Sequence, residues 1–356
     1  MTVLVYLSLL WCVTSLLIYL LVLVSKSSKK VALSDEWPNV SILISLRNEE
    51  ENVQRLCEQL VQLDYPKEKL EILIGDDDSQ DQTLKVLREY ETENFKVFSY
   101  ANEQTGHFGK QKVLKSLYQK SKGEVLLFTD GDMVLQPGWV KAMLPGTDVL
   151  KVGVTAVALR GIGSALQNLD WLINEFMIKW LSEKRIYLTA WGNNMAVRRT
   201  WLQKVEYESL PESEVEDIAL SQAMVQAGAR IEITSESSAR LWTKPVGLKR
   251  ILHQRLRWMK GVKRVPIWIY GAMALRLGFL PMVMLLTAFH WQFVFLIVVK
   301  MVFHLWFLLK ADGRKLNFWS FLSICFYDVY EILLYFSSFV AHVLRVQFDW
   351  KGRVYR

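Results

Sequence analysis

The chain keeps its apolar and its acidic residues apart. Long apolar tracts occupy residues 3–24 and about 267–344, whereas nearly all carboxylates lie between them. Half of the 356 residues are hydrophobic (51%) and 22% are charged, which excludes an intrinsically disordered chain. The separation excludes a simple soluble enzyme, and it also excludes a transporter built from helices throughout. We expect a folded central region between membrane segments.

The first apolar tract predicts a membrane anchor over residues 1–25, which contain no Asp, Glu, Lys, Arg or His. The 22 residues from 3 to 24 would reach roughly 33 Å as a helix, enough to cross a ~30 Å hydrocarbon core. A cleaved signal peptide would have a basic start and a small-residue cleavage site, and neither is present. Because Lys26, Lys29 and Lys30 follow the tract, its C-terminal flank is predicted to be cytoplasmic.

The second apolar region predicts two or three transmembrane or re-entrant helices over residues 267–345. The loop 310–315 and the tail 346–356 are both basic, and the tail is predicted to be cytoplasmic. A single membrane span between the loop and the tail would nevertheless place them on opposite sides of the membrane. A re-entrant or interface-lying segment over residues 267–277 would resolve this conflict. Asp328 and Glu331 lie one helical turn apart in the last stretch, and they indicate either a lipid portal or simple helix packing.

Residues 38–248 alternate between strand and helix patterns and predict an α/β, Rossmann-like domain with a mostly parallel sheet. Ligands of such sheets bind beyond the carboxyl ends of the strands, which is where the acidic groups of this chain lie. The expected strands are residues 40–46, 71–75, 96–100 and 124–129, and the expected helices are residues 50–63, 79–90 and 110–120.

Two acidic groups follow expected strands. Asp76, Asp77 and Asp78 come after the second strand, and helix capping explains only one or two of the three. Adjacent like charges cost energy unless a ligand or cation uses them, so we assign Asp77 a functional role. Asp130 and Asp132 flank a glycine after the fourth strand, and together they could hold a divalent cation with phosphate oxygens.

Two further groups lie closer to the second apolar region. Glu216 and Asp217 precede an apolar helical pattern. Either they place favourable negative charge in the first turn of a helix, or they are functional residues. Residues 249–266 predict a basic helix at the lipid headgroups. Within it stand Gln254, Arg257 and Trp258; an arginine could hold a pyrophosphate, and an indole could stack on a sugar.

The cysteines, histidines and basic residues indicate no further kind of functional site. The three cysteines are far apart, and the five histidines form no closely spaced pair, so neither a disulfide framework nor a zinc site is expected. The basic residues gather beside apolar spans and do not form a soluble patch with exposed aromatics. Nucleic-acid binding is therefore not expected.

The ordered motifs resemble the membrane-bound family 2 glycosyltransferases of the GT-A fold that carry a Q-x-x-R-W sequence. The resemblance runs from about Ser41 to Trp258, with Asp78 where the family usually has glycine and Val215 where it usually has threonine. The matching segments are R-N-E-E at 47–50, D-D-x-S-x-D-x-T at 76–83, D-x-D at 130–132, E-D at 216–217 and Q-x-x-R-W at 254–258.

The resemblance implies roles for the donor-side residues. Asp77 would contact the nucleotide base of a nucleotide-sugar, with Arg47 and Glu49 lining the same pocket. Asp130 would lie beside the ribose and pyrophosphate, and Asp132, with Asp130, would bind Mg²⁺ or Mn²⁺.

It also implies roles on the acceptor side. Asp217 would be the general base of an inverting transfer, and Arg257 would stabilise the departing diphosphate. Gln254 and Trp258 would close the donor and acceptor pocket. The segment containing Gly192 and Asn194 resembles the family's acceptor loop or is an ordinary turn; both interpretations remain open here.

Residues 350–355 (WKGRVY) resemble the ending of ceramide-glucosyltransferase-like enzymes. Three or four spans are few for a polymer channel, so we predict transfer of one sugar, UDP-linked, to a membrane lipid hydroxyl. The alternatives are a processive polysaccharide synthase working with a membrane protein partner and a non-catalytic membrane scaffold. A multi-pass protein of the bacterial plasma membrane with a cytoplasmic catalytic domain is the predicted location.

Overall fold

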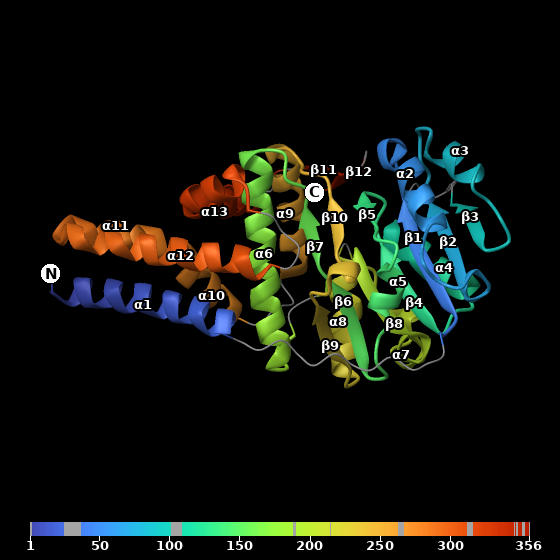
Figure 1. The fold of residues 1–356 in the computed structure, drawn as a ribbon, viewed down its shortest axis with the longest axis horizontal. Helices are drawn as coiled ribbons and strands as arrows, with labels where there is room; N and C mark the ends of the chain where they lie inside the picture. Colours follow the sequence, from blue (N-terminus) through green and yellow to red (C-terminus); the bar gives the residue numbers. More distant parts are fainter. Residues whose placement is uncertain are drawn as a thin grey trace.

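A computed structural model describes residues 2–24, 37–100, 109–187, 190–213, 215–262, 267–311, 316–344, 346, 348–350 and 353–355. The middle of the chain forms a mixed α/β body, and long helices from both ends of the chain extend from one side of it (Figure 1). The basic residues that set the predicted orientation, namely Lys26, Lys29, Lys30, most of the loop 310–315 and Lys351, lie outside the described residues.

The main sheet has seven strands in the order β3-β2-β1-β4-β8-β6-β9. β1 pairs in parallel with β2 and β4, and β2 with β3, whereas β8 is antiparallel to its neighbours β4 and β6. The predicted mostly parallel sheet is thereby confirmed. The strands are β1 (Val40–Leu46), β2 (Leu70–Asp76), β3 (Phe95–Ser99), β4 (Val125–Thr129), β6 (Val149–Gly153), β8 (Asn194–Arg198) and β9 (Arg230–Thr234).

Helices cover both faces of this sheet because its strands alternate their apolar side chains. Ile42 and Ile44 belong to one buried core, and Leu43 between them belongs to the other. The covering helices are α2 (Glu50–Val61), α3 (Thr83–Arg88), α4 (Lys110–Lys120), α5 (Trp139–Met143), α7 (Arg199–Lys204) and α8 (Glu216–Gln226). The described residues also form short 3₁₀ helices, namely η1 (Lys67–Lys69), η2 (Tyr207–Ser209), η3 (Ser237–Ala239) and η4 (Trp291–Val294).

A second, three-stranded sheet joins distant parts of the chain. It contains β5 (Met133–Val134), β10 (Leu241–Thr243) and β7 (Thr155–Val157), with β10 in the middle. β5 directly follows the D-x-D segment, and β10 shortly precedes helix α9 (Leu248–Val262), which carries Q-x-x-R-W. This sheet therefore brings the two motifs to the same side of the body. A small hairpin of β11 (Phe348–Trp350) and β12 (Arg353–Tyr355) closes the chain.

Three of the described helices are long and apolar enough to cross a membrane: Thr2–Val24, Trp291–Lys310 and Phe318–Val343, with mean hydropathies of 2.5, 2.1 and 1.4. A fourth candidate is the bent pair α10 (Trp268–Leu277) and α11 (Phe279–Phe289), which meet at 46°. The helices are labelled α1 (Thr2–Val24), α12 (Phe295–Lys310) and α13 (Phe318–Val343). These features are consistent with membrane association.

The bend between α10 and α11 lies at Gly278, where α1 approaches closely. A Cβ at this position would lie 2.9 Å from the Ala274 carbonyl oxygen and 2.9 Å from Trp11 Cζ2. Trp11 Nε1 donates a hydrogen bond of 3.1 Å to the Leu275 carbonyl. The absence of a side chain at Gly278 thus permits the packing of α1 against the bend.

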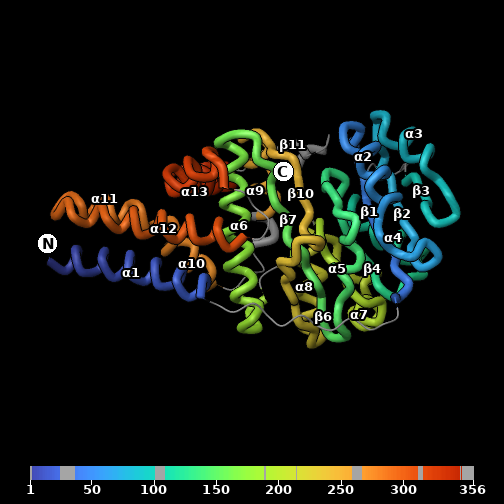
Figure 2. The backbone as a smooth tube through the Cα atoms, in the orientation of Figure 1, coloured from blue at the N-terminus to red at the C-terminus, as the bar shows by residue number. Residues whose placement is uncertain are grey.

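Helix α6 (Ile162–Glu183) crosses between the α/β body and the terminal helices (Figures 1 and 2). It packs on β7 and β9 on one side and on α12 and α13 on the other. Its residues Leu169, Leu172 and Ile173 share a buried core with Tyr19 and Tyr327. The sequence analysis assigned no element to this segment.

The charges in the terminal helices are paired. Lys300 on α12 pairs with Asp328 on α13, and Arg276 on α10 pairs with Glu331 on α13. Lys300 is 0% exposed and Glu331 1%, so both pairs hold helices together inside the bundle. Of the two interpretations of Asp328 and Glu331, the structure supports helix packing.

The prediction that Asn194 binds an acceptor is wrong. Asn194 is fully buried, and its amide Oδ1 accepts a 2.9 Å hydrogen bond from Trp139 Nε1. Its Nδ2 donates to the carbonyls of Val154 and Ala239 at 3.1 and 2.9 Å. Both N–H groups of this amide are used within the fold, and a side chain that is fully buried cannot reach a ligand in the cavity.

Removing the Asn194 amide should destabilise the fold. Asn194→Ala removes the partner of the Trp139 indole N–H and of the Ala239 carbonyl, whereas the Val154 carbonyl keeps the Leu241 backbone N–H. We expect a loss of about 2–4 kcal/mol in the free energy of unfolding. Thermal unfolding of the purified protein measures this loss. Asn94→Ala, which removes the exposed Asn94 amide and its bond to the Lys67 carbonyl, is the control and should change stability little. Equal stability of the two variants would contradict the structural role.

The Lys300–Asp328 pair can be tested by removing one or both charges. Lys300→Met leaves Asp328 without its cation inside an apolar bundle, and it should cost about 3–5 kcal/mol of unfolding free energy. Lys300→Met with Asp328→Leu removes both charges and should restore most of that loss. Thermal unfolding in detergent compares the variants. A double variant no more stable than Lys300→Met would show that the pair is not the source of the effect.

Candidate active site

The loops after β1 and β2 are tied together at the carboxyl edge of the sheet. Arg47 donates hydrogen bonds to the carbonyls of Asp77 and Asp78, the second at 2.7 Å. Asp77 is 3% exposed, and its Oδ1 accepts a 3.2 Å hydrogen bond from the Gly109 backbone N–H. The predicted donor residues Arg47 and Asp77 thus lie side by side.

Asp78 occupies the position where the family motif usually has glycine, and its backbone explains that preference. Its φ is +58°, in the left-handed region that most side chains avoid. Aspartate is one of the few residues that enters this region readily, because its short side chain bonds locally. The turn that follows Asp77 is therefore preserved despite the substitution.

The D-G-D turn after β4 packs against the end of β1. A Cβ at Gly131 would lie 2.5 Å from Leu46 Cδ2 and 3.0 Å from Glu49 Cγ. The glycine thus lets Glu49 approach the turn from the neighbouring loop. On the other side, Asp132 Oδ2 accepts a 3.1 Å hydrogen bond from Thr243 Oγ1. Residues from β1, β4 and β10 meet at this turn.

Asp130 and Asp132 match the chemistry of a divalent cation. Carboxylate oxygens are the hard ligands that Mg²⁺ and Mn²⁺ prefer. Among the described residues no group of three or more histidines, cysteines or carboxylates could hold a metal. Two carboxylates alone do not complete a coordination sphere, so these residues fit a cation that is shared with oxygens of water or a bound phosphate.

Lys110 connects the D-G-D turn to the acidic start of α8, and the sequence analysis did not select it. Its Nζ lies 2.7 Å from Asp130 Oδ1 and 2.6 Å from Glu216 Oε1. Burial acts to lower the pKa of Lys110, but the two carboxylates together outweigh it and raise the pKa, so the ammonium stays charged. A lysine as the first residue of α4 opposes the helix dipole, and that unfavourable position is a signal that sequence reasoning could have used.

Asp217 lies in the first turn of α8, partly buried beside Glu216. Its Oδ2 accepts a 2.9 Å hydrogen bond from the Gly192 backbone N–H, and its Oδ1 a 2.8 Å hydrogen bond from its neighbour Ile218. Burial, followed by repulsion from Glu216, raises the pKa of Asp217 to about 6. The Gly192 N–H and the cations Lys110 and Arg257 oppose this rise. A carboxylate with such a pKa is suited to accept a proton near neutral pH.

Gly192 is placed against Asp217 because it has no side chain. A Cβ at Gly192 would lie 2.9 Å from Asp217 Cβ and 3.1 Å from Asp217 Oδ2. Any larger residue would displace the carboxylate or break its bond to the backbone.

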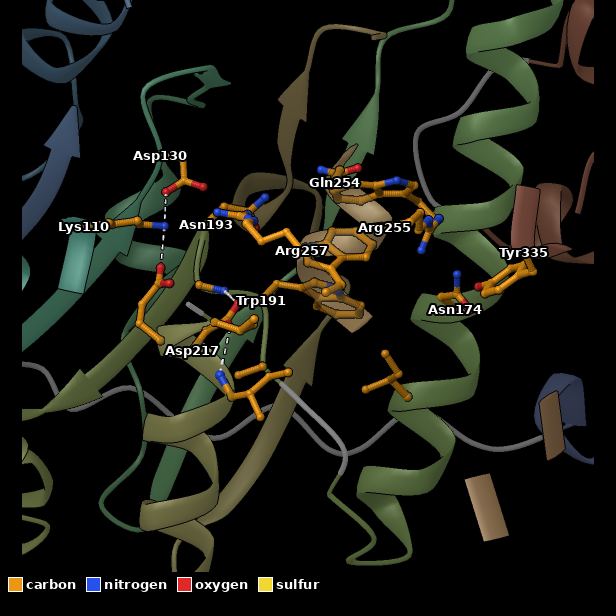
Figure 3. Close-up of a pocket in the computed structure, with 18 residues that line it drawn as sticks. Lys110, Asp130, Asn174, Trp191, Asn193, Asp217, Gln254, Arg255, Arg257 and Tyr335 are labelled. Atoms are coloured by element: carbon orange, nitrogen blue, oxygen red, sulfur yellow. Dashed lines mark hydrogen bonds and ion pairs between the residues drawn. The ribbon is translucent and has the colours of Figure 1, made fainter. Parts of the chain in front are cut away.

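Helix α9 supplies the opposite wall. Gln254, Arg257 and Trp258 of this helix line the cavity that contains Asp217. Figure 3 shows Gln254 and Arg257 on this wall. Arg255 lies on the side of α6 and pairs with the buried Asp170. The Arg255 guanidinium lies 4.7 Å from the centre of the Trp258 ring.

One cavity of about 280 Å³ collects these groups. Lys110 and Asp130 lie at one end in Figure 3, Asp217 and Arg257 in the middle, and the other end reaches α6 and α13. At that far end the lining residues are mostly uncharged: Trp171, Asn174, Ile178 and Tyr335.

The cavity unites six of the predicted site residues: Asp130, Gly192, Asp217, Gln254, Arg257 and Trp258. Four others, Arg47, Glu49, Asp77 and Asp132, do not line it and lie at the adjoining strand ends. Asn194 is buried in the core, as described above. The cavity also includes residues that were not selected from the sequence: Lys110, Trp171, Asn174, Arg255 and Tyr335.

Comparison with curated proteins gives relatives of one enzyme class. Glycosyltransferase AglE of Haloferax volcanii is 26% identical over 261 residues, covering 71% of this chain and 81% of that protein. Beta-monoglucosyldiacylglycerol synthase of Trichormus variabilis is 30% identical over 172 residues, covering 46% of this chain and 36% of that protein.

A solved structure matches nearly the whole fold. The mannosyltransferase PcManGT from Pyrobaculum calidifontis, in complex with GDP-Man and Mn²⁺, superimposes with a TM-score of 0.59 at 16% identity. The match covers 96% of this chain and 99% of that one, which confirms the predicted GT-A-like fold.

A family model decides the assignment. The model of Glycosyl transferase family 21 matches residues 7–356, so the predicted glycosyltransferase resemblance is confirmed. This protein is a glycosyltransferase and belongs to glycosyl transferase family 21.

Proposed function

We propose that this enzyme transfers one sugar from a nucleotide-sugar, UDP-linked, to a hydroxyl group of a membrane lipid, with inversion at the anomeric carbon. The observation that carries the proposal is the course of the cavity. It begins at Lys110 and Asp130, passes Asp217 and Arg257, and ends at α6 and α13 beside the membrane helices. A lipid whose headgroup entered at the far end would meet the base and the donor in one space.

The donor is proposed to lie along the carboxyl edge of the sheet. Arg47, Glu49 and Asp77 would receive its base, and Asp130 its ribose and pyrophosphate. Asp130 and Asp132 would hold Mg²⁺ or Mn²⁺, which when bound would neutralise the diphosphate and so favour its departure. The GDP-Man and Mn²⁺ complex of PcManGT supports this kind of donor and cation.

Asp217 is proposed to take the proton of the acceptor hydroxyl. Gly192 fixes the carboxylate through its N–H, which leaves the cavity side of the group for an acceptor. Arg257 faces Asp217 across the cavity, and its positive charge would stabilise the negative charge that develops on the departing diphosphate. Gln254 and Trp258 would close the pocket around the sugar.

The lipid acceptor is supported by two facts. The far end of the cavity is lined by the mostly uncharged side chains of α6 and α13. One relative is named as a synthase of beta-monoglucosyldiacylglycerol, which is a glycolipid. We extend the proposal to a multi-pass protein of a bacterial plasma membrane whose catalytic domain faces the cytoplasm.

The product identifies the acceptor class. The full chain in vesicles that contain diacylglycerol, incubated with Mn²⁺ and each of several radiolabelled UDP-sugars, should place label in an organic-extractable lipid. Asp217→Asn should lower that rate by about a hundredfold or more, because general bases contribute about 10²–10⁴. The control is Glu93→Gln, which changes an exposed carboxylate that is distant from Asp217 in the sequence. This variant should transfer label at the rate of the unaltered protein. Label found only in a water-soluble polymer would support a polysaccharide synthase instead.

The pH dependence of the rate tests the role of Asp217 separately. The base must be ionised, so kcat/KM should fall by about tenfold per unit as the pH drops below about 6. Glu216→Gln removes the like charge that raises the pKa of Asp217, so it should move this acidic limb to lower pH. The pH–rate profiles of the two proteins provide the measurement. An acidic limb that stays in place in Glu216→Gln would contradict the assignment.

A further inference from the structure

The Q-x-x-R-W helix has two faces with different tasks. Arg257 and Arg255 both line the cavity, but Arg255 is 9% exposed and pairs with Asp170 of α6. Its guanidinium lies over the Trp258 ring at 4.7 Å and over the Tyr335 ring of α13 at 5.6 Å. Arg255 therefore connects the side chains of the cavity to the terminal helices.

Asp170 of α6 is the carboxylate that receives Arg255. It is 0% exposed, and its Oδ2 accepts a hydrogen bond from Arg255. Its Oδ1 accepts a 3.0 Å hydrogen bond from the Tyr327 hydroxyl of α13 and lies 3.5 Å from Arg276 of α10. One buried carboxylate thus joins α6 to three other helices.

This arrangement fixes how α9 sits on the cavity. α9 packs on α13, and its stacked Arg255 and Trp258 both line the cavity while Arg255 pairs with Asp170. Trp171, next to Asp170, contacts the same Trp258 ring at a centroid distance of 6.2 Å. Arg257 lies between Arg255 and Trp258 in the sequence of the helix. The direction of the Arg257 side chain therefore depends on the contacts that fix the Arg255 and Trp258 side chains.

We propose that Asp170 is a positioning residue of the active site. It holds Arg255, and through Arg255 and Trp258 it orients Gln254 and Arg257 toward the donor. The main sheet and the terminal helices then contribute to one site, because α6 contacts both of them. The proposal rests on the proposed function for its kinetic consequence and on geometry alone for its structural consequence.

The test compares two variants that each remove one carboxylate from a buried ion pair. Asp170→Asn breaks the contact with α9, whereas Asp328→Asn, the matched control, breaks the Lys300 pair between α12 and α13. Hydrogen exchange of backbone amides in residues 248–258 should rise by about tenfold in Asp170→Asn and stay within about twofold in Asp328→Asn.

Donor hydrolysis with UDP-glucose and Mn²⁺ provides the kinetic measurement. In Asp170→Asn we expect kcat to fall by about tenfold or more while the donor KM changes by less than about threefold, because Arg257 would act on charge that develops in the transition state. Asp328→Asn should keep both constants. Equal effects of the two variants, or unchanged exchange and kinetics in Asp170→Asn, would overturn the proposal.

A second variant tests the same proposal if Asp170→Asn does not fold. Arg255→Gln leaves Asp170 with Arg276 and Tyr327, and it should reproduce the fall in kcat and the faster exchange of α9. If both variants fold, Asp170→Asn with Arg255→Gln should be no worse than either change alone. Strictly additive losses would contradict the shared role. A wild-type chain that places label from no UDP-sugar in a lipid would refute the proposed function, whereas the exchange measurement would still decide the role of Asp170.

Discussion

The pairing of buried charges at Asp170 is the interaction on which the rest of the structure depends. An unpaired charge in an apolar interior costs several kcal/mol, so helices that carry such charges assemble only where partners meet. Arg255, Arg276 and Tyr327 come from three helices and converge on Asp170 of α6. This convergence sets the place of the Q-x-x-R-W helix relative to the sheet, and hence the shape of the cavity.

The site itself combines a rigid sheet edge with a helix held from outside the sheet. Parallel strands deliver Arg47, Asp77 and Asp130 to one edge, and glycines at 131 and 192 permit the close approach of Glu49 and Asp217. The charges at this edge are balanced by Lys110, which bridges Asp130 and Glu216. The opposing wall, with Gln254 and Arg257, comes from α9. Such a division is compatible with the proposed donor at the sheet and the proposed acceptor on the side of the terminal helices.

The sequence predicted those features that depend on local order. Strands followed by carboxylates located the edge of the sheet. The family resemblance of the Glu216–Asp217 pair selected Asp217, which lines the cavity. Lys110 and Arg255 were missed because their roles depend on partners such as Asp130 and Asp170, which lie distant along the chain. α6 was missed because its apolar face serves two neighbours at once, so it resembles neither a span nor an ordinary surface helix. Asn194 was misjudged for a related reason, since only the fold shows that its amide faces Trp139.

The central claim is that the sheet edge and α9 surround a single donor. A cryo-EM map of the full chain with UDP and Mn²⁺ tests it most directly. If the two walls share one donor, the map will contain density for the diphosphate between the Asp130–Asp132 turn and Arg257, with the uracil beside Arg47 and Asp77. Nucleotide density that touches only one of these two walls, or that lies elsewhere on the protein, would contradict the account.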